Sequence, residues 1–223
     1  MSESALVVFV KHARPGVVKT RLAASIGNEA AAALYRAVVE HVLEATTPRP
    51  GDYERLVFFD PPEALAEMRD WLPGVRLLAQ CGGDLGARMS DAFARAFARG
   101  ASRVAIVGTD APDVTRDTVR EALRALDAAD AAIGPAQDGG YYLLALREPR
   151  PQLFEGLAWS TRTVAAETRA RATALGLTLH ELPILRDLDT LDDLRALWPR
   201  LSGLLEARPA LREALRRHVD LLG

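Results

Sequence analysis

The chain has 223 residues, a formal net charge of -2, 49% hydrophobic residues and 26% charged residues. These values are typical of a globular protein with a sizeable core, and they argue against nucleic acid as a partner. A single cysteine excludes an internal disulfide and a cysteine-based zinc site, and no apolar run approaches the roughly 20 residues that span a bilayer. The first residues lack the layout of a signal peptide, so we expect a cytoplasmic protein.

Apolar runs of strand length alternate with segments of helical period along the chain. Strands are expected at residues 6–10, 56–59, 75–78, 104–107, 131–134, 141–146 and 177–182. Helices are expected at residues 28–45, 64–72, 88–100, 115–126, 163–175, 191–205 and 210–222. The alternation predicts an α/β protein, a three-layer α/β/α sandwich around a mostly parallel, mixed sheet. Because no flexible linker divides the sequence, we expect one domain over residues 1–223, with a helical appendage from about residue 191.

A basic segment follows the first expected strand. Lys11, Arg14, Lys19 and Arg21 lie within eleven positions, around Pro15 and Gly16. Lysine, arginine and backbone N–H groups on such a loop can surround a polyphosphate. The glycine spacing is neither that of a P-loop nor that of a dinucleotide-binding fingerprint. The alternative interpretation is a solvated basic turn, and the position after the first strand of an α/β sheet favours phosphate binding.

The strand expected at residues 104–107 ends on Gly-Thr-Asp, with Thr109 and Asp110 at its carboxyl end. In open α/β sheets this edge is where ligands bind. A carboxylate there can hold a hard cation such as Mg²⁺ or Mn²⁺, which in turn binds phosphate oxygens. The alternative is that Asp110 stabilises the turn before the next helix.

Two glycine-rich segments and a Trp-Ser-Thr segment are further candidates. Gly83, Asp84 and Arg88 belong to a segment with three glycines in five residues, which either lets the backbone approach a ligand or forms a turn with Asp84 as helix cap. The second segment contains Asp138, Gly139, Gly140 and Tyr141, and it is a hairpin signal or, alternatively, the glycine floor of a pocket. Trp159, Ser160 and Thr161 precede a helix that Ser160 or Thr161 is expected to cap, although a helix start is also an anion site.

Four carboxylates lie within seven positions just before the helix expected at 191–205. Asp192 and Asp193 fit its first turn, where acidic side chains favour the helix dipole. Asp187 and Asp189 have no such role. If this segment is extended, both would face a cleft near Asp110, with the intervening leucine facing the body. The alternative is an exposed acidic turn screened by salt.

Taken together, six segments resemble a bacterial family of small proposed glycosyltransferases, some associated with arsenosugar biosynthesis, within the GT-A-type nucleotide-diphospho-sugar transferase superfamily. The matching patterns, in order from Lys11 to Leu194, are Lys-x-Pro-x-Pro-Gly-x-Val-Lys-Thr-Arg-Leu, Asp-Leu-Gly-x-Arg-Met, Gly-Thr-Asp-x-Pro, Asp-Gly-Gly-Tyr, Trp-Ser-Thr and Asp-x-Asp-Thr-x-x-Asp-Leu. One departure is Ala13, where the pattern has proline. Phospholactate guanylyltransferases and molybdenum cofactor guanylyltransferases have a similar basic loop and metal-binding aspartate.

The resemblance implies roles for these residues. Asp110, together with Asp187 or Asp189, would hold a divalent metal, Mg²⁺ or Mn²⁺, and Asp110 and Asp138 would be the catalytic residues. The nucleotide and its phosphates would meet Lys11, Arg14, Gly16, Lys19, Arg21, Gly83, Asp84, Arg88 and Thr109. The acceptor or sugar pocket would be lined by Gly139, Gly140, Tyr141, Trp159, Ser160 and Thr161.

Three functions follow from this reading. The leading hypothesis is a metal-dependent glycosyltransferase that uses a nucleotide-diphospho-sugar and a small-molecule acceptor. The first alternative is a nucleotidyltransferase that joins an NMP from an NTP to a phosphorylated small molecule, as guanylyltransferases do. The second is a nucleotide-binding protein without turnover. The sequence leaves open the base, the sugar, the acceptor and whether the chain forms a homodimer.

Overall fold

The computed structural model describes residues 3–219, and within them seven strands form one sheet in the order β3-β2-β1-β4-β6-β5-β7. The strands are β1 (Ser4–Lys11), β2 (Glu54–Asp60), β3 (Leu77–Ala79), β4 (Arg103–Val107), β5 (Ala131–Pro135), β6 (Tyr141–Leu146) and β7 (Leu179–Glu181). The helices are α1 (Thr20–Ile26), α2 (Asn28–Ala45), α3 (Leu65–Trp71), α4 (Leu85–Phe97), α5 (Arg116–Ala125), α6 (Val164–Ala174), α7 (Leu191–Leu204) and α8 (Pro209–Val219). Short 3-10 turns occupy Pro62–Ala64 and Pro151–Leu153.

The sheet is mixed, as predicted. β1 runs parallel to both β2 and β4, β3 runs parallel to β2, and β7 runs parallel to β5. β6 is antiparallel to β4 and to β5, which it follows as the second strand of the hairpin expected at the Asp-Gly-Gly segment. The carboxyl ends of β1, β2, β4 and β5 therefore lie at one edge of the sheet.

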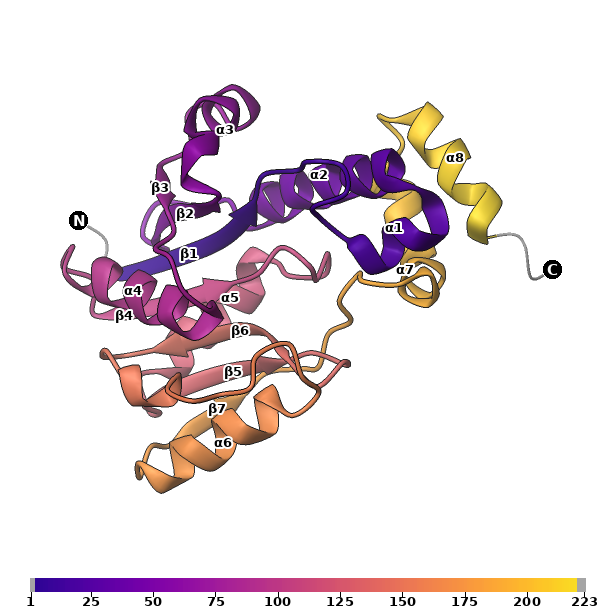
Figure 1. Cartoon of the computed structure of the whole chain (residues 1–223). Helices are drawn as coiled ribbons and strands as arrows, with labels where there is room; N and C mark the ends of the chain where they lie inside the picture. The colour runs from indigo at the N-terminus through magenta and orange to yellow at the C-terminus, as the bar shows by residue number, and fades with distance from the viewer. Residues whose placement is uncertain (1–2, 220–223) are drawn as a thin grey trace.

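Helices cover both faces of the sheet, which confirms the three-layer sandwich. On one face α2, α3 and α5 bury side chains such as Val39, Met68 and Val119 against the strands. On the other face α4 and α6 bury Phe93 and Ala165 (Figure 1). Burial of this much apolar surface on both sides explains why the central strands read as continuous hydrophobic runs.

The two C-terminal helices lie beside the sheet rather than on its faces. In Figure 1, α7 and α8 lie next to α1 and the adjacent end of α2. Leucines of α7 and α8 share a third buried cluster with Leu22 of α1 and Val38 of α2. Leu188, which precedes α7, is fully buried in the same cluster. This packing anchors the acidic segment before α7 to the helix that follows the basic loop.

Several predicted boundaries need correction. The sequence reading gave no helix before residue 28, but α1 occupies Thr20–Ile26 and thus forms the end of the basic segment. β3 begins two residues later than expected. The expected cap at Ser160 or Thr161 is wrong, because α6 begins at Val164 without a side-chain cap. The predicted end of the last helix, at 220–222, lies outside the described residues. No helix between residues 3 and 219 is long and apolar enough to cross a membrane.

Candidate functional site

Lys19 forms ion pairs with two aspartates at the carboxyl edge of the sheet. The Lys19 Nζ lies 2.5 Å from Asp110 Oδ1 and 2.8 Å from Asp189 Oδ1, and the lysine side chain is only 4% exposed. These partners are 91 and 170 positions away in the sequence. Lys19 has φ 50° and ψ 42°, a left-handed conformation that costs a non-glycine residue about 1–2 kcal/mol. The two ion pairs offset this strain.

The acidic segment reaches Asp110 by an extended path from β7. Leu182 N–H donates to Ile133 O, Leu185 N–H donates to Pro135 O, and Leu188 N–H donates to Asp110 O at 2.8 Å. The segment thus follows the end of β5 and then contacts the end of β4 before it enters α7 (Figure 1). As the alternation predicts, Leu188 is buried while its two neighbouring aspartates face the Asp110 side. We call Lys19, Asp110, Asp187 and Asp189 the carboxylate cluster.

The charges of this cluster are strongly coupled. Burial alone would lower the pKa of Lys19, but Asp110 and Asp189 outweigh it and raise that pKa, so Lys19 is a cation. Burial alone would raise the pKa of Asp110, but the Lys19 ammonium holds it below its usual range. Burial raises the pKa of Asp187 to about 8, with repulsion from Asp110, Asp138 and Asp189 added. Oδ1 of Asp187 is buried and has no hydrogen-bond partner within the described structure.

Tyr35 is a residue of this site that the sequence analysis missed. Its buried hydroxyl accepts a hydrogen bond from Lys11 N–H at 2.9 Å and lies 3.2 Å from Thr109 Oγ1. It therefore links the end of β1 to the end of β4, from which the basic loop and Asp110 depart. Burial, followed by the nearby Asp110 carboxylate, raises the pKa of Tyr35 to about 12, so the hydroxyl is neutral. In the sequence, Tyr35 is indistinguishable from the apolar residues of α2.

The other basic residues of the loop are on the surface. Lys11 and Arg21 are exposed, and neither makes an ion pair within residues 3–219. Arg14 is exposed as well, but its Nε donates to His12 Nδ1 and its guanidinium lies 3.5 Å from Glu67. Gly16, with φ 76°, provides the turn of the loop. Lys11 and Arg21 are thus the charges most available to an anionic ligand.

Three residues expected at the nucleotide are already engaged within the protein. Asp84 caps α4 by accepting Ala87 N–H at 2.8 Å, the alternative considered from the sequence. Arg88 lies 3.1 Å from Asp60 Oδ2 and donates to Gln80 and to Gly83 O. Thr109 is 2% exposed, and its hydroxyl contacts Tyr35 and Phe9 O. These side chains hold the loops in place, so a contact with a nucleotide would come from the neighbouring backbone.

The hairpin turn and the Trp-Ser-Thr segment pack against each other and against α4. A Cβ on Gly139, where φ is 93°, would collide with Arg162 O, and a Cβ on Gly86 would lie 2.8 Å from the Trp159 ring. Asp138 accepts Gly140 N–H at 2.8 Å. We call residues 82–88, 138–140 and 159–162 the glycine-rich rim. Close backbone approach explains Gly86 and Gly139 without a ligand, whereas nothing lies within 4 Å of a Cβ on Gly82.

The polar side chains around this rim differ in their exposure. Ser160 and Thr161 are exposed, and the Thr161 hydroxyl donates to Ala158 O. Tyr141 donates to Met89 Sδ, and burial raises its pKa. Its ring is partly buried and packs against the core, and its place at a substrate pocket stays a prediction.

Two further features delimit the site. Between residues 3 and 219, no three His, Cys, Asp or Glu side chains converge closely enough to hold a metal ion by themselves.

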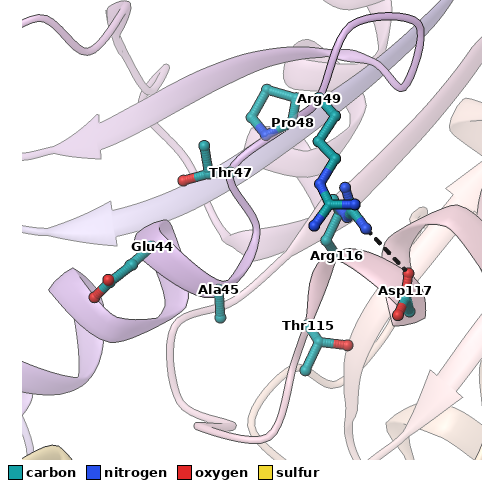
Figure 2. Close-up of a pocket in the computed structure, with 8 residues that line it drawn as sticks. All are labelled: Glu44, Ala45, Thr47, Pro48, Arg49, Thr115, Arg116 and Asp117. Carbon is teal, nitrogen blue, oxygen red and sulfur yellow. Dashed lines mark ion pairs between the residues drawn. The ribbon is translucent and has the colours of Figure 1, made fainter.

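A pocket of about 400 Å³ lies elsewhere, between the end of α2 and the start of α5, and Figure 2 shows Arg116 directed at Asp117 there. It shares no residue with the predicted site, and Arg116 also pairs with Asp52. We therefore assign it no function.

Comparison with known proteins gives three informative matches. The chain is 33% identical over 187 residues to a phosphoenolpyruvate guanylyltransferase of Chloroflexus aggregans, covering 79% of this chain and 89% of that protein. It is 36% identical to a proposed nucleotide-diphospho-sugar transferase of Desulfovibrio desulfuricans G20, with a TM-score of 0.87, covering 96% of this chain and 99% of that one. A cytidylyltransferase of Leptospira borgpetersenii, 13% identical, shares the fold with a TM-score of 0.54, over 95% and 97% of the two chains.

These similarities agree with the superfamily that the six sequence patterns indicated, and the relatives named are transferases. Residues 43–161 match the family described as "Uncharacterized protein conserved in bacteria", DUF2064. The matched range includes Asp110 and most of the glycine-rich rim, whereas Lys19 and the acidic segment lie outside it. The chain belongs to the DUF2064 family, with the fold of the nucleotide-diphospho-sugar transferases.

Proposed function

We propose that this protein is a metal-dependent transferase that binds a nucleotide through its phosphates and transfers part of it to a small acceptor. The observation that carries the proposal is the buried Lys19 side chain shared between Asp110 and Asp189, beside an Asp187 oxygen that has no hydrogen-bond partner among residues 3–219. A protein that only needed a stable fold would gain little from three buried or half-buried carboxylates around one lysine, because burying charges is costly.

A divalent cation fits the chemistry of this donor set. Carboxylate oxygens are the ligands that Mg²⁺ and Mn²⁺ prefer, and the unpartnered Asp187 Oδ1 is the kind of atom that a cation would satisfy. Asp110, together with Asp187 or Asp189, would hold the metal, and the phosphates of the nucleotide would complete its ligands. When bound, it would neutralise the phosphates and stabilise charge on the leaving group.

The chain's own residues have separate tasks in this proposal. Lys11 and Arg21 are exposed and make no ion pair with the described residues, so they would bind and orient the phosphates. Tyr35 fixes the ends of β1 and β4, which sets the spacing between these cations and Asp110. Asp138 and the exposed Ser160 and Thr161 would face the acceptor. No covalent nucleophile is required, so positioning and electrostatics supply the rate.

Nucleotidyl transfer is the reaction that we favour. The relative from Chloroflexus aggregans, 33% identical over most of both chains, is a phosphoenolpyruvate guanylyltransferase. By analogy, a phosphate oxygen of the acceptor attacks the α-phosphorus of an NTP, the bond to the β-phosphate oxygen breaks, and pyrophosphate leaves. The acceptor would be a small phosphorylated molecule, and the cations of the basic loop would serve its phosphate as well as those of the donor.

Glycosyl transfer, the leading hypothesis from the sequence, is the second candidate. It is favoured by the 36% identity to the proposed nucleotide-diphospho-sugar transferase of Desulfovibrio desulfuricans, which spans nearly the whole of both chains. In that reaction a nucleoside diphosphate leaves and the acceptor need not carry a phosphate.

The two reactions are distinguished by their products. Purified protein is incubated with Mg²⁺ or Mn²⁺ and either the four NTPs with phosphoenolpyruvate and other phosphorylated acids, or nucleotide-sugars with a panel of acceptors. Pyrophosphate release that requires both acceptor and metal supports nucleotidyl transfer, and release of a nucleoside diphosphate supports glycosyl transfer. If nucleotides stabilise the protein against heat but are never consumed, the protein binds nucleotides without turnover and the proposal is wrong.

A further inference from the structure

The Lys19 ammonium lies among the carboxylates that are candidates for binding the metal. Its side chain is almost completely buried, and the ammonium lies within ion-pair distance of Asp110 and Asp189. Lysine is rarely buried unless it is paired. One ammonium cannot neutralise both Asp110 and Asp189, and Asp187 Oδ1 is an atom left without a hydrogen-bond partner among the described residues. The cluster therefore keeps excess negative charge, while its best-placed ligands are already occupied.

We propose that Lys19 holds the cation position of this site in the nucleotide-free protein, and that the ligand which binds is a complex of a divalent cation with a nucleoside phosphate. This inference rests on the proposed function. In the bound complex, Asp110 and Asp189 would face the cation, and the released Lys19 ammonium would pair with the phosphates. Each of these charges would thus exchange one partner for another.

Neither component alone achieves this exchange. A free divalent cation must displace a buried ammonium that then has no anion to meet. A free nucleotide brings its phosphates toward unneutralised carboxylates. Mg²⁺ is usually bound through one or two carboxylates together with substrate phosphates, which agrees with the absence of a ready three-residue metal site among residues 3–219. Binding of cation and nucleotide must therefore be mutually favourable.

The surroundings of Lys19 suit such an exchange. Its long, flexible side chain can leave the carboxylates by rotation about its own bonds. The basic loop that precedes it is mostly exposed, and Lys11 and Arg21 offer unpaired cations on either side of it in the sequence. Phosphates bound by these two residues would lie within reach of a released lysine.

The test is the affinity of the nucleotide-free protein for Mn²⁺, measured by calorimetry and by the thermal shift that Mn²⁺ produces. Lys19→Met keeps a flexible, unbranched side chain that is one atom shorter and removes the charge, so Mn²⁺ should bind about tenfold tighter than to the wild type. Mn²⁺ should also raise the melting temperature of the variant more than that of the wild type. Arg69→Met removes an equal charge that is exposed, makes no ion pair among the described residues and does not act on the carboxylate cluster, so it should not tighten Mn²⁺ binding. Lys19→Gln, which can still donate to the carboxylates, replaces Lys19→Met if the latter fails to fold.

The outcomes separate this inference from the proposed function. If Lys19→Met binds Mn²⁺ no more tightly than the wild type, Lys19 does not compete with the metal and the inference is wrong, although the transferase proposal stands. If no variant and not even the wild type with GTP, CTP, ATP or UTP binds Mn²⁺, the metal-dependent function itself is wrong. Tighter binding in Lys19→Met that is abolished by adding Asp187→Asn supports both.

Discussion

The carboxylate cluster and the glycine-rich rim lie along the same edge of the sheet and were predicted from the same kind of sequence pattern, yet they differ in how their residues are used. In the rim, Asp84 caps a helix, Arg88 is bound to Asp60, and Gly139 makes room for Arg162 O. In the cluster, Asp187 Oδ1 has no hydrogen-bond partner among the described residues, and a lysine side chain is buried on a strained backbone. The polar groups of the rim are bonded within the fold, whereas the cluster has an oxygen atom available to a ligand.

This difference teaches which motif residues to test for chemistry. A polar group that is fully bonded within the fold contributes mainly to shape, and its loss should appear as lost stability. A buried polar group that lacks a partner in the fold costs stability, so its presence indicates a role in function, and its loss should appear as lost binding or turnover. Four substitutions, each with a control, test this contrast between the cluster and the rim.

The largest effect is expected for Asp110→Asn. Removing this carboxylate should lower metal-dependent turnover, measured by product release, by about 100- to 1,000-fold, the usual range for a preorganised electrostatic group. The control is Asp84→Asn, because asparagine caps helices as well as aspartate does. It should leave both stability and turnover unchanged. A comparable loss of turnover in Asp84→Asn would mean that the rim takes part in chemistry as well.

Gly139→Ala should act on stability. The added methyl group meets Arg162 O and the residue keeps a positive φ, so we expect the free energy of unfolding in urea to fall by about 2–4 kcal/mol. Gly176→Ala is the matched control, since φ there is 70° and nothing lies within 4 Å of the new Cβ. It should cost only the conformational part, about 1–2 kcal/mol. Equal losses at both positions would contradict the close packing of the hairpin turn.

Arg21→Ala should weaken nucleotide binding, measured by calorimetry, by about ten- to a hundredfold, which corresponds to roughly 1.5–3 kcal/mol for one contact to a charged group. Its stability should not change, because the Arg21 guanidinium makes no ion pair in the described structure. Arg88→Ala provides the contrast: it loses contacts to Asp60 and Gln80, so stability should fall. If Arg88→Ala loses more affinity than Arg21→Ala, the division of tasks is reversed.

The smallest effect is expected for Tyr35→Phe. Loss of the hydroxyl leaves Lys11 N–H and Thr109 Oγ1 without this partner, and we expect unfolding to require about 1–2 kcal/mol less. Turnover should fall more than this modest loss of stability implies, because the ends of β1 and β4 are no longer tied together. Tyr53→Phe, which removes a buried hydroxyl bonded to Thr46 O, serves as the control and should leave turnover intact.

Local patterns in the sequence predicted the strands, most helices and the hairpin, and they offered the Asp84 cap as one of two interpretations, because each depends on neighbouring residues. The alternation Asp187–Leu188–Asp189 also predicted correctly that the leucine is buried. The α1 helix could not be predicted, since it has seven residues and begins after a lysine held left-handed by distant aspartates. Tyr35 was missed for the same reason: its partners lie on β1 and β4, and only the tertiary fold brings them together.

The extended path from β7 to α7 has a consequence for synthesis of the chain. Chains emerge from the ribosome N-terminus first, and elements fold as they become available. Lys19 and Asp110 are both made by mid-chain, but Asp187 and Asp189 arrive only with the last fifth of the sequence. Until Leu188 is buried against α1 and its N–H reaches Asp110 O, the growing chain has a lysine paired with one aspartate and no finished site. A chain that stalls or is clipped before residue 182 could keep much of the sheet and still be inert.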